Sequence, residues 1–199
     1  MLYENLHSSV FLRVLRGLFL MHFSLADLVT DITQNAIEAG SSTVELVVSE
    51  TDKEFRFLVK DNGKGMTEEE LKRAIDPFVT DGIKHPNRKV GLGLPFLIQT
   101  AEQSGGGSDI KSEKGKGTTV SAWFDKNNFD IPPTGDVAGM FRTILMFESD
   151  AEVIIRRKKM EDDEYEIKKS ELIDTIGELN DASSLVLLKQ YLESLESDD

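Results

Sequence analysis

The sequence predicts an α+β fold, because segments with the period of a helix and segments with the period of a strand both occur along its 199 residues. Apolar side chains recur at helical spacing through residues 25–39, which follow a Ser-x-x-Asp capping box and end at Gly40. Residues 54–60 instead alternate apolar and polar side chains, as a half-buried strand does. Residues 43–49, 110–113 and 118–124 provide further strand-like runs.

The composition is typical of a soluble globular protein, with 39% hydrophobic and 30% charged residues. The formal net charge of −13 opposes non-specific binding to nucleic acid or to an anionic membrane, so we expect neither as a partner. The chain has no cysteine, which excludes disulfides, thiolate zinc sites and cysteine nucleophiles and suits a reducing cytoplasm. A phosphate-rich ligand would have to be held by local features, such as backbone N–H groups, a metal ion and a few lysines.

Residues 1–23 contain an apolar stretch that we interpret as an amphipathic helix. Arg13 and Arg16 interrupt this stretch, and it is too short to span a bilayer. It has neither a charged segment before it nor a small-residue cleavage site, so it does not have the pattern of a signal peptide. Its apolar side chains would cover either the protein's own core or the interface of a homodimer.

A carboxylate followed by two glycines ends the predicted strand at residues 54–60. Asp61 is followed by Gly63 and Gly65, in the sequence Asp-Asn-Gly-Lys-Gly-Met that ends at Met66. Glycines at such positions let the backbone turn tightly or approach a ligand closely. Taken alone, the pattern is more typical of an ordinary turn at the end of a strand.

Three further stretches, in a defined order along the chain, favour a more specific interpretation. Residues 31–35 read Asp-Ile-Thr-Gln-Asn, residues 91–94 read Gly-Leu-Gly-Leu, and residues 114–120 read Lys-Gly-Lys-Gly-Thr-Thr-Val. With residues 61–66 they resemble the N box, the two glycine boxes and the final G-x-G-T of the GHKL ATP-binding superfamily, which includes gyrase, Hsp90, histidine kinases and MutL. Pro-Phe-Val-Thr at residues 77–80 looks most like the histidine-kinase branch.

This resemblance spans residues 25–124 and implies a Bergerat-type two-layer sandwich, in which helices pack on one face of a mixed sheet. It also implies binding of ATP with Mg²⁺. The implied adenine-reading residue is Asp61, whose carboxylate would accept a hydrogen bond from the exocyclic amine that adenine has and guanine lacks. Residues 104–108 have the composition of a flexible linker, but the resemblance places a glycine turn before the second-last strand there.

Asp31 and Asn35 are four residues apart and therefore lie on one face of the predicted helix. Without the resemblance, they would simply form a solvated polar stripe. The resemblance implies that Asn35 supplies a side-chain oxygen to Mg²⁺, which needs few protein ligands when phosphate oxygens are present. It places Asp31 at the position of a water-activating carboxylate, where many family members have the longer Glu.

The implied phosphate site lies before a helix that has Pro95 in its first turn. A helix N-terminus offers free N–H groups and the positive end of the helix dipole. Thr118 is expected to bond the phosphates or the Asp61 network. The complete set of candidate site residues is Asp31 as the catalytic base, Asn35 as the Mg²⁺ ligand, and Asn35, Asp61, Gly63, Gly65, Met66, Gly91, Leu92, Gly93, Leu94 and Thr118 as nucleotide-binding residues.

Residues 76–90 contain Gly, Pro and Lys without a clear period, as functional loops do, and their place between the glycine boxes resembles a short nucleotide lid. Lys84, Arg88 and Lys89 would either reach the phosphates or stay solvated.

A change of composition at residues 125–133 predicts a boundary. We therefore divide the chain into an N-terminal helix (1–23), an ATP-binding domain (24–130) and a C-terminal extension (131–199). In the extension, residues 135–147 are either a helix or a buried strand, residues 152–169 have the pattern of a charged hairpin, and residues 170–179 and 181–195 are amphipathic helices. The leucines at positions 185, 188, 192 and 195 would pack within the chain or form a coiled coil.

Three classes of function stay open at this point. The first is a phosphotransferase, either a fragment of a histidine kinase or a stand-alone serine kinase of anti-sigma type whose substrate is supplied by another chain. The second is an ATPase of the gyrase and MutL type, in which nucleotide drives closure and Asp31 acts on water. The third is a non-catalytic nucleotide-sensing module that docks on a larger complex through its N-terminal helix or C-terminal extension. We expect a regulatory, signalling ATP-binding protein with weak ATPase or kinase activity.

Overall fold

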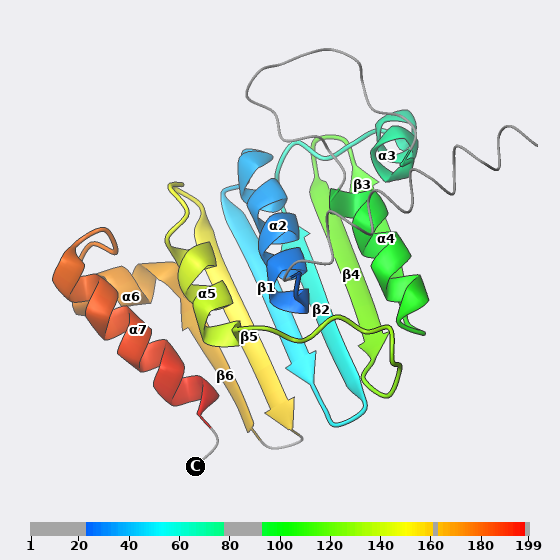
Figure 1. The fold of residues 1–199 in the computed structure, drawn as a ribbon. Helices are drawn as coiled ribbons and strands as arrows, with labels where there is room; N and C mark the ends of the chain where they lie inside the picture. Colours follow the sequence, from blue (N-terminus) through cyan, green and yellow to red (C-terminus); the bar gives the residue numbers. More distant parts are fainter. Residues whose placement is uncertain (1–22, 78–92, 161–162, 198–199) are drawn as a thin grey trace, which may run out of the picture.

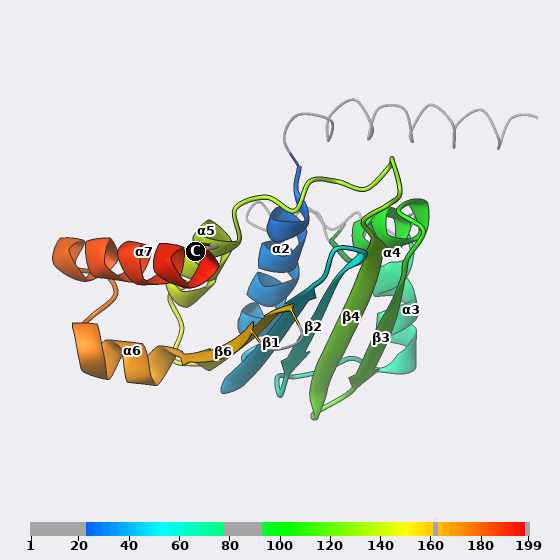
Figure 2. The same cartoon turned by 90° about the horizontal axis from the view of Figure 1, so that it is seen from below.

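A computed structural model describes residues 23–77, 93–160 and 163–197, in which helices cover one face of a single sheet (Figures 1 and 2). The helices are α2 (Leu25–Glu38), α3 (Glu68–Ile75), α4 (Gly93–Gln103), α5 (Val137–Leu145), α6 (Lys169–Ile176) and α7 (Ala182–Glu196). The strands are β1 (Thr43–Glu50), β2 (Glu54–Asp61), β3 (Gly107–Glu113), β4 (Gly117–Asp125), β5 (Glu152–Met160) and β6 (Asp163–Lys168).

The strand order is β3-β4-β2-β1-β5-β6, with every neighbouring pair antiparallel except β1 and β5, which are parallel. The sheet is therefore mixed, and the predicted α+β fold with helices on one face is confirmed (Figure 1). None of the helices within these described residues is long and apolar enough to cross a membrane.

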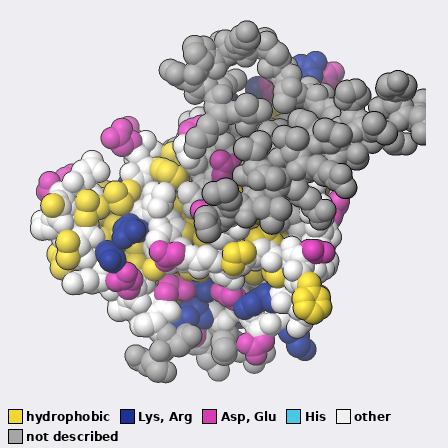
Figure 3. Space-filling model, viewed as in Figure 1, with side chains coloured by type: hydrophobic (Ala, Val, Ile, Leu, Met, Phe, Trp, Pro, Cys, Tyr) yellow, Lys and Arg dark blue, Asp and Glu magenta, His cyan; other side chains and the backbone are white. Residues whose placement is uncertain are grey.

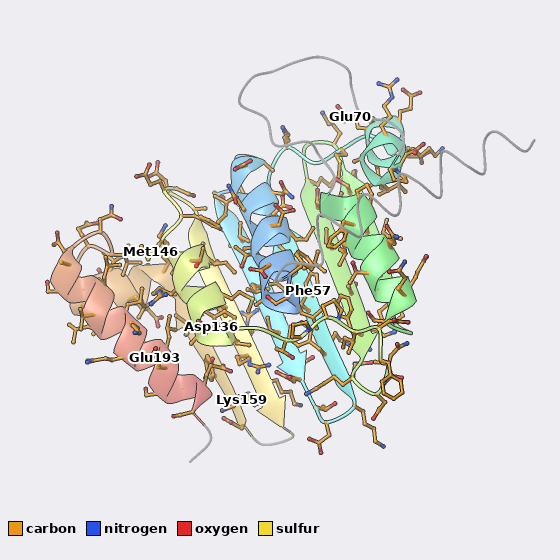
Figure 4. The ribbon with its side chains drawn as sticks, viewed as in Figure 1. Phe57, Glu70, Asp136, Met146, Lys159 and Glu193 are labelled. Carbon is orange, nitrogen blue, oxygen red and sulfur yellow. The ribbon has the colours of Figure 1, made fainter. Side chains whose placement is uncertain are left out.

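Alternation along the central strands builds the core between the sheet and the helices. Phe55, Phe57 and Val59 of β2 are at most 2% exposed, and Phe57 lies in the layer next to α2 (Figure 4). Each such side chain contributes about 1.5–3 kcal/mol when it leaves water. On α2, the buried residues recur at helical spacing, as Leu25, Leu28 and Ile32 illustrate. The two periods expected at residues 25–39 and 54–60 are confirmed.

The N-terminus of α2 is held from two directions. Ser24 and Asp27 form the predicted capping box, in which each side chain accepts from the other's backbone N–H. In addition, the N–H groups of Leu25 and Ala26 donate to the carbonyls of Pro133 and Thr134, both at 2.9 Å. A helix cannot satisfy these first donors internally, so the segment after β4 completes the start of α2.

The sheet and the core continue across residue 130, which lies between β4 and α5. Strand β5 pairs with β1 from Thr43 opposite Glu152 to Ser49 opposite Lys158. Strand β5 contributes Val153 to the core, where it is fully buried. Helix α5 packs beside α2 and buries its own apolar face, including Phe141, Ile144 and Leu145.

The C-terminal part of the chain packs against the rest of the molecule, and its structure decides between the alternatives left open by the sequence. Residues 135–147 contain a helix, α5, whose N-cap Asp136 accepts from the Gly139 N–H at 2.8 Å. The charged hairpin is confirmed as β5 and β6, with Arg156 2.7 Å from Glu166 on the neighbouring strand. Leu188 and Leu192 of α7 are buried in the common core, so the leucine seam packs intramolecularly.

A buried ionic cluster attaches the end of α7 to the sheet. The Arg157 side chain is 3% exposed and lies 2.9 Å from Glu50 of β1 and 3.2 Å from Glu196 of α7. The Tyr165 hydroxyl also donates to Glu196, and burial followed by this bond raises the pKa of Tyr165. Burial alone would raise the pKa of Glu50, but hydrogen bonds from Lys126 and Arg157 outweigh it and lower that pKa. Beside the cluster, Lys159 donates to the Leu195 carbonyl at 3.3 Å (Figure 4).

Two sequence expectations lie outside the described residues. The N-terminal amphipathic helix of residues 1–23 falls there except for its last residue. Most of the lid, with Lys84, Arg88 and Lys89, also falls there.

Candidate functional site

The Asp61 carboxylate is fixed at the end of β2, where it is 7% exposed. Its Oδ1 atom accepts from the Gly63 N–H at 2.8 Å and lies 3.3 Å from the Ser41 hydroxyl. That hydroxyl is itself 2.6 Å from the Ala36 carbonyl at the end of α2. No described residue donates to Oδ2, which leaves this oxygen available to a donor on a ligand.

The glycines after Asp61 are required by close packing of the loop. A Cβ atom on Gly63 would lie 2.7 Å from the Ser41 hydroxyl oxygen. Gly65 has a φ of +55° and its Cβ would lie 1.9 Å from the Glu113 carbonyl oxygen, so both its conformation and its surroundings exclude a side chain. The loop therefore packs closely against the residues that follow α2 and against the turn that joins β3 to β4.

Ser112 of β3 connects two of the candidate residues. The Met66 N–H donates to its hydroxyl at 2.8 Å, and that hydroxyl lies 2.9 Å from the Thr118 hydroxyl. Thr118 is thus linked to the loop backbone, and the described residues provide no direct bond from its hydroxyl to Asp61. Sequence reasoning missed Ser112, because a serine on a strand has no distinguishing spacing.

Asn62 and Glu70 join the segments next to this loop through side-chain hydrogen bonds, and the sequence analysis did not predict these bonds. The Asn62 side chain accepts from the Ser42 and Thr43 N–H groups at 2.9 and 3.0 Å, which joins the end of β2 to the start of β1. The Glu70 side chain, labelled in Figure 4, accepts a hydrogen bond from the Thr67 N–H at the start of α3. It also accepts one from Nζ of Lys114, in the β3–β4 turn, at 2.9 Å. The Thr67 N–H and then Lys114 hold the pKa of Glu70 below its ordinary value.

Helices α2 and α4 bring the other candidate residues together. A Cβ atom on Gly93 would lie 2.3 Å from Asp31 Oδ2 and 3.4 Å from Asn35 Nδ2. Asp31 is half-buried and Asn35 is exposed, so both side chains lie at the start of α4 without being enclosed. Leu94 packs against the core from the first turn of α4, whereas Gly91 and Leu92 lie outside the described residues.

All the described candidates thus gather at one end of the sheet, where β2 and α2 end and α4 and β4 begin (Figure 1). The chemistry available there is a buried carboxylate that accepts hydrogen bonds, an amide oxygen that suits a hard cation, and a second carboxylate able to take a proton. Within the described part of the chain, no group of three or more His, Cys, Asp or Glu side chains is placed to hold a metal ion.

The fold is similar to that of solved structures. The crystal structure of the N terminal domain of a DNA repair protein matches 75% of this chain and 53% of that chain, with a TM-score of 0.51 and 12% sequence identity. At that identity the match concerns the fold alone.

The sequence also matches known proteins over the region of the site. The sensor histidine kinase ZraS of Escherichia coli (strain K12) is 28% identical over 113 residues, which are 56% of this chain and 23% of ZraS. ZraS of Salmonella typhi is 34% identical over 106 residues, which are 50% of this chain and 21% of that protein. The sensor protein SrrB of Staphylococcus aureus (strain NCTC 8325 / PS 47) is 33% identical over 94 residues, 45% of this chain and 16% of SrrB.

These matches span less than a quarter of each curated relative. The model of the family described as histidine kinase-, DNA gyrase B- and HSP90-like ATPases matches residues 23–128, which contain every described candidate residue. The chain therefore belongs to this family, and these residues form a histidine-kinase-like ATP-binding domain.

Proposed function

We propose that this protein is a Mg-ATP-binding regulatory protein with weak ATPase or protein kinase activity. The observation that carries the proposal is Asp61, a nearly buried carboxylate whose Oδ1 is bonded to Gly63 while Oδ2 is left for a ligand. In this proposal Oδ2 accepts from the exocyclic amine of adenine. Because the same position of guanine carries an acceptor, the site selects ATP over GTP.

The residues at the start of α4 fit a magnesium-bound polyphosphate. Asn35 offers an exposed amide oxygen, which is a hard ligand of the kind that Mg²⁺ uses together with phosphate oxygens and water. The N–H groups at the start of α4 favour anions, and the missing side chain of Gly93 keeps this terminus close to α2. When bound, the cation would neutralise phosphate charge. Gly91 and Leu92 are proposed to add backbone contacts to the phosphates.

Asp31 is the proposed general base. Its carboxylate lies next to Gly93, at the edge where the phosphates would be held, and is half-buried. A carboxylate placed there could take the proton of an attacking water or of a hydroxyl group on a protein substrate. Hydrolysis and protein phosphorylation differ in the group that accepts the phosphoryl group, which is water in one case and a protein hydroxyl in the other. Both would use the same nucleotide site, so both belong to one proposal.

The sensor histidine kinases among the relatives support a role in signalling. A second candidate is a non-catalytic nucleotide sensor that docks on a larger assembly. It is favoured by an open apolar groove between α5 and α7, on the part of the chain beyond the family match. In that case the site binds ATP and Asp31 takes no proton.

The test is incubation of the whole protein with γ-labelled ATP and magnesium, alone and with cell extract. Released phosphate identifies an ATPase, and label on a protein identifies a kinase. Binding without either identifies a sensor. Calorimetry with ATP, GTP and ATP plus a chelator gives the affinity in the same preparations. If ATP does not bind, or binds no better than GTP, the proposed site is wrong.

A further inference from the structure

A groove between α5 and α7 exposes apolar side chains on the helix-covered face of the molecule (Figure 3). It has a volume of about 650 Å³ and lies between the last turn of α5 and the first two turns of α7. Seven residues line this groove, namely Arg142, Thr143, Met146 and Phe147 from the α5 side and Leu185, Val186 and Lys189 from α7.

The helices on either side of the groove are fixed against each other, while side chains along the groove stay exposed. Ile144 and Leu145 of α5 and Leu188 of α7 are fully buried in the common core, and α5 packs against α7. Val186 is nevertheless 56% exposed, and Met146 is 36% exposed. Met146 is the C-cap of α5 and is labelled in Figure 4. Apolar side chains gathered on one surface in this way mark an interaction site more often than apolar residues scattered singly.

The charge of the groove is opposite to that of the protein. The chain carries a formal net charge of −13, yet the only charged side chains among the described residues that line the groove are two cations, Arg142 and Lys189. Two acids, Asp136 and Glu193, line a smaller neighbouring pocket together with Arg142 and Lys189. Glu193 lies 3.6 Å from Lys189, and no ion pair joins Arg142 to a described acidic side chain. An exposed pair such as Lys189 with Glu193 is weak, so Lys189 can exchange partners at little cost.

The backbone around the groove favours a helix as the occupant. Both walls are helices, so the groove offers no strand edge along which an extended chain could pair. Side chains of a third helix, in contrast, can fit between those of two packed helices. Helices that bind in this way present apolar residues at positions i, i+3, i+4 and i+7.

We propose that this groove is a docking site for an amphipathic helix of a partner protein, with acidic residues flanking the apolar face of that helix. The apolar face would cover Met146 and Val186, and its carboxylates would pair with Arg142 and Lys189. The proposal does not depend on what the protein does with ATP, since no groove residue belongs to the candidate nucleotide site.

The test uses a displayed library of helical peptides as the probe. Each peptide has a constant apolar face, and the positions flanking that face vary among Asp, Glu, Lys and Arg. We expect the whole wild-type protein to enrich acidic flanks. The Arg142→Glu and Lys189→Glu double variant should instead enrich basic flanks and bind the original peptides at least about tenfold more weakly. The matched control carries Lys53→Glu, in the turn between β1 and β2, and Lys111→Glu, on β3, and should behave as wild type because both lysines are exposed and outside the groove.

A single substitution tests the apolar contact separately. Val186→Ser should weaken the enriched peptides about tenfold, as loss of a central anchor does. Phe129→Ser, at a fully exposed aromatic residue outside the groove, should have no effect. Enrichment without a charge preference, no enrichment, or equal binding to the double variant would overturn the proposal. Sedimentation of the protein alone gives one more outcome that overturns it, namely a dimer that Val186→Ser dissociates, because the groove would then hold a second copy.

Discussion

Gly93 and Asp31 meet at the point where α4 approaches α2, so closely that a Cβ atom on Gly93 would lie 2.3 Å from Asp31 Oδ2. The two residues are 62 positions apart in the sequence, yet the Asp31 side chain occupies the space that a side chain at position 93 would need. The glycine lets the start of α4 reach the helix that carries Asp31 and Asn35. A side chain at position 93 would occupy the space between the proposed phosphate site and the Asp31 carboxylate.

Gly93→Ala should weaken ATP binding about tenfold, because either the Asp31 carboxylate or the start of α4 has to shift to relieve the contact. Calorimetry with Mg-ATP measures the effect. Asp31→Ala in the same chain removes the atom that the new methyl group meets and should restore most of the affinity. If the double variant binds ATP as weakly as Gly93→Ala alone, the contact between these two residues is not the cause.

Asp61→Ala should remove the preference for adenine. A buried hydrogen bond to a charged group contributes about 1.5–3 kcal/mol, so ATP should bind at least about tenfold more weakly while GTP is unaffected. Asp109→Ala, at an exposed carboxylate of β3, is the matched control and should leave both affinities unchanged. Equal binding of ATP and GTP by the wild-type protein would refute the assignment of Asp61.

Asn35 and Asp31 should separate metal binding from chemistry. Asn35→Ala removes the amide oxygen, so ATP affinity should no longer depend on magnesium. Asp31→Asn keeps the shape of the side chain but cannot accept a proton, so binding should persist while hydrolysis or transfer stops. Phosphate release and calorimetry measure the two effects on the same samples. An Asp31→Asn protein that turns over ATP at the wild-type rate would exclude Asp31 as the base.

The local parts of this structure could be predicted from the sequence, because they depend on short-range patterns. The alternation of residues 54–60 and the capping box at Ser24 correctly indicated β2 and the start of α2. Residues 135–147 could not be assigned, because a short apolar run fits a helix or a buried strand. Packing beside α2 and α7 decides in favour of the helix α5.

The long-range parts could not be predicted in the same way. The parallel pairing of β1 with β5 joins segments about a hundred residues apart, and no local pattern specifies it. Composition misleads at residues 104–108, where a Cβ atom on Gly106 would lie 1.8 Å from the Trp123 carbonyl oxygen, so this glycine is tightly packed and not part of a flexible linker. Ser112 has no sequence signal because its importance lies in two hydrogen bonds from other elements.

Glu196→Ala should destabilise the protein by about 3 kcal/mol, because it removes one partner of a buried ion pair and leaves Arg157 partly uncompensated. No described residue hydrogen-bonds to Nη1 of Arg157, so little local compensation is available among the residues that the structure describes. Glu193→Ala is the matched control on the same helix, where an exposed pair with Lys189 contributes at most about 1 kcal/mol. Urea denaturation measures both, and equal values for the two variants would contradict the role given to this cluster.

Removal of residues 131–199 should unfold the ATP-binding domain and not merely delete an appendage. The truncation exposes β1 as an unpaired edge, removes the fully buried Phe141 and Val153 from the common core, and takes away the carbonyls that accept from Leu25 and Ala26. Each buried apolar side chain contributes about 1.5–3 kcal/mol, so losing several exceeds the total stability of about 5–15 kcal/mol of an ordinary domain.

Near-ultraviolet circular dichroism, thermal melting and ATP calorimetry on residues 1–130 measure this outcome. A second truncation after residue 180 removes α7 but keeps all six strands, so it should fold with reduced stability and still bind ATP. The comparison separates loss of the sheet from loss of one helix. A fragment of residues 1–130 that melts cooperatively within about 5 °C of the whole chain would mean that β5 and α5 add little to the core. The pairing of β1 with β5 would then be incidental to nucleotide binding.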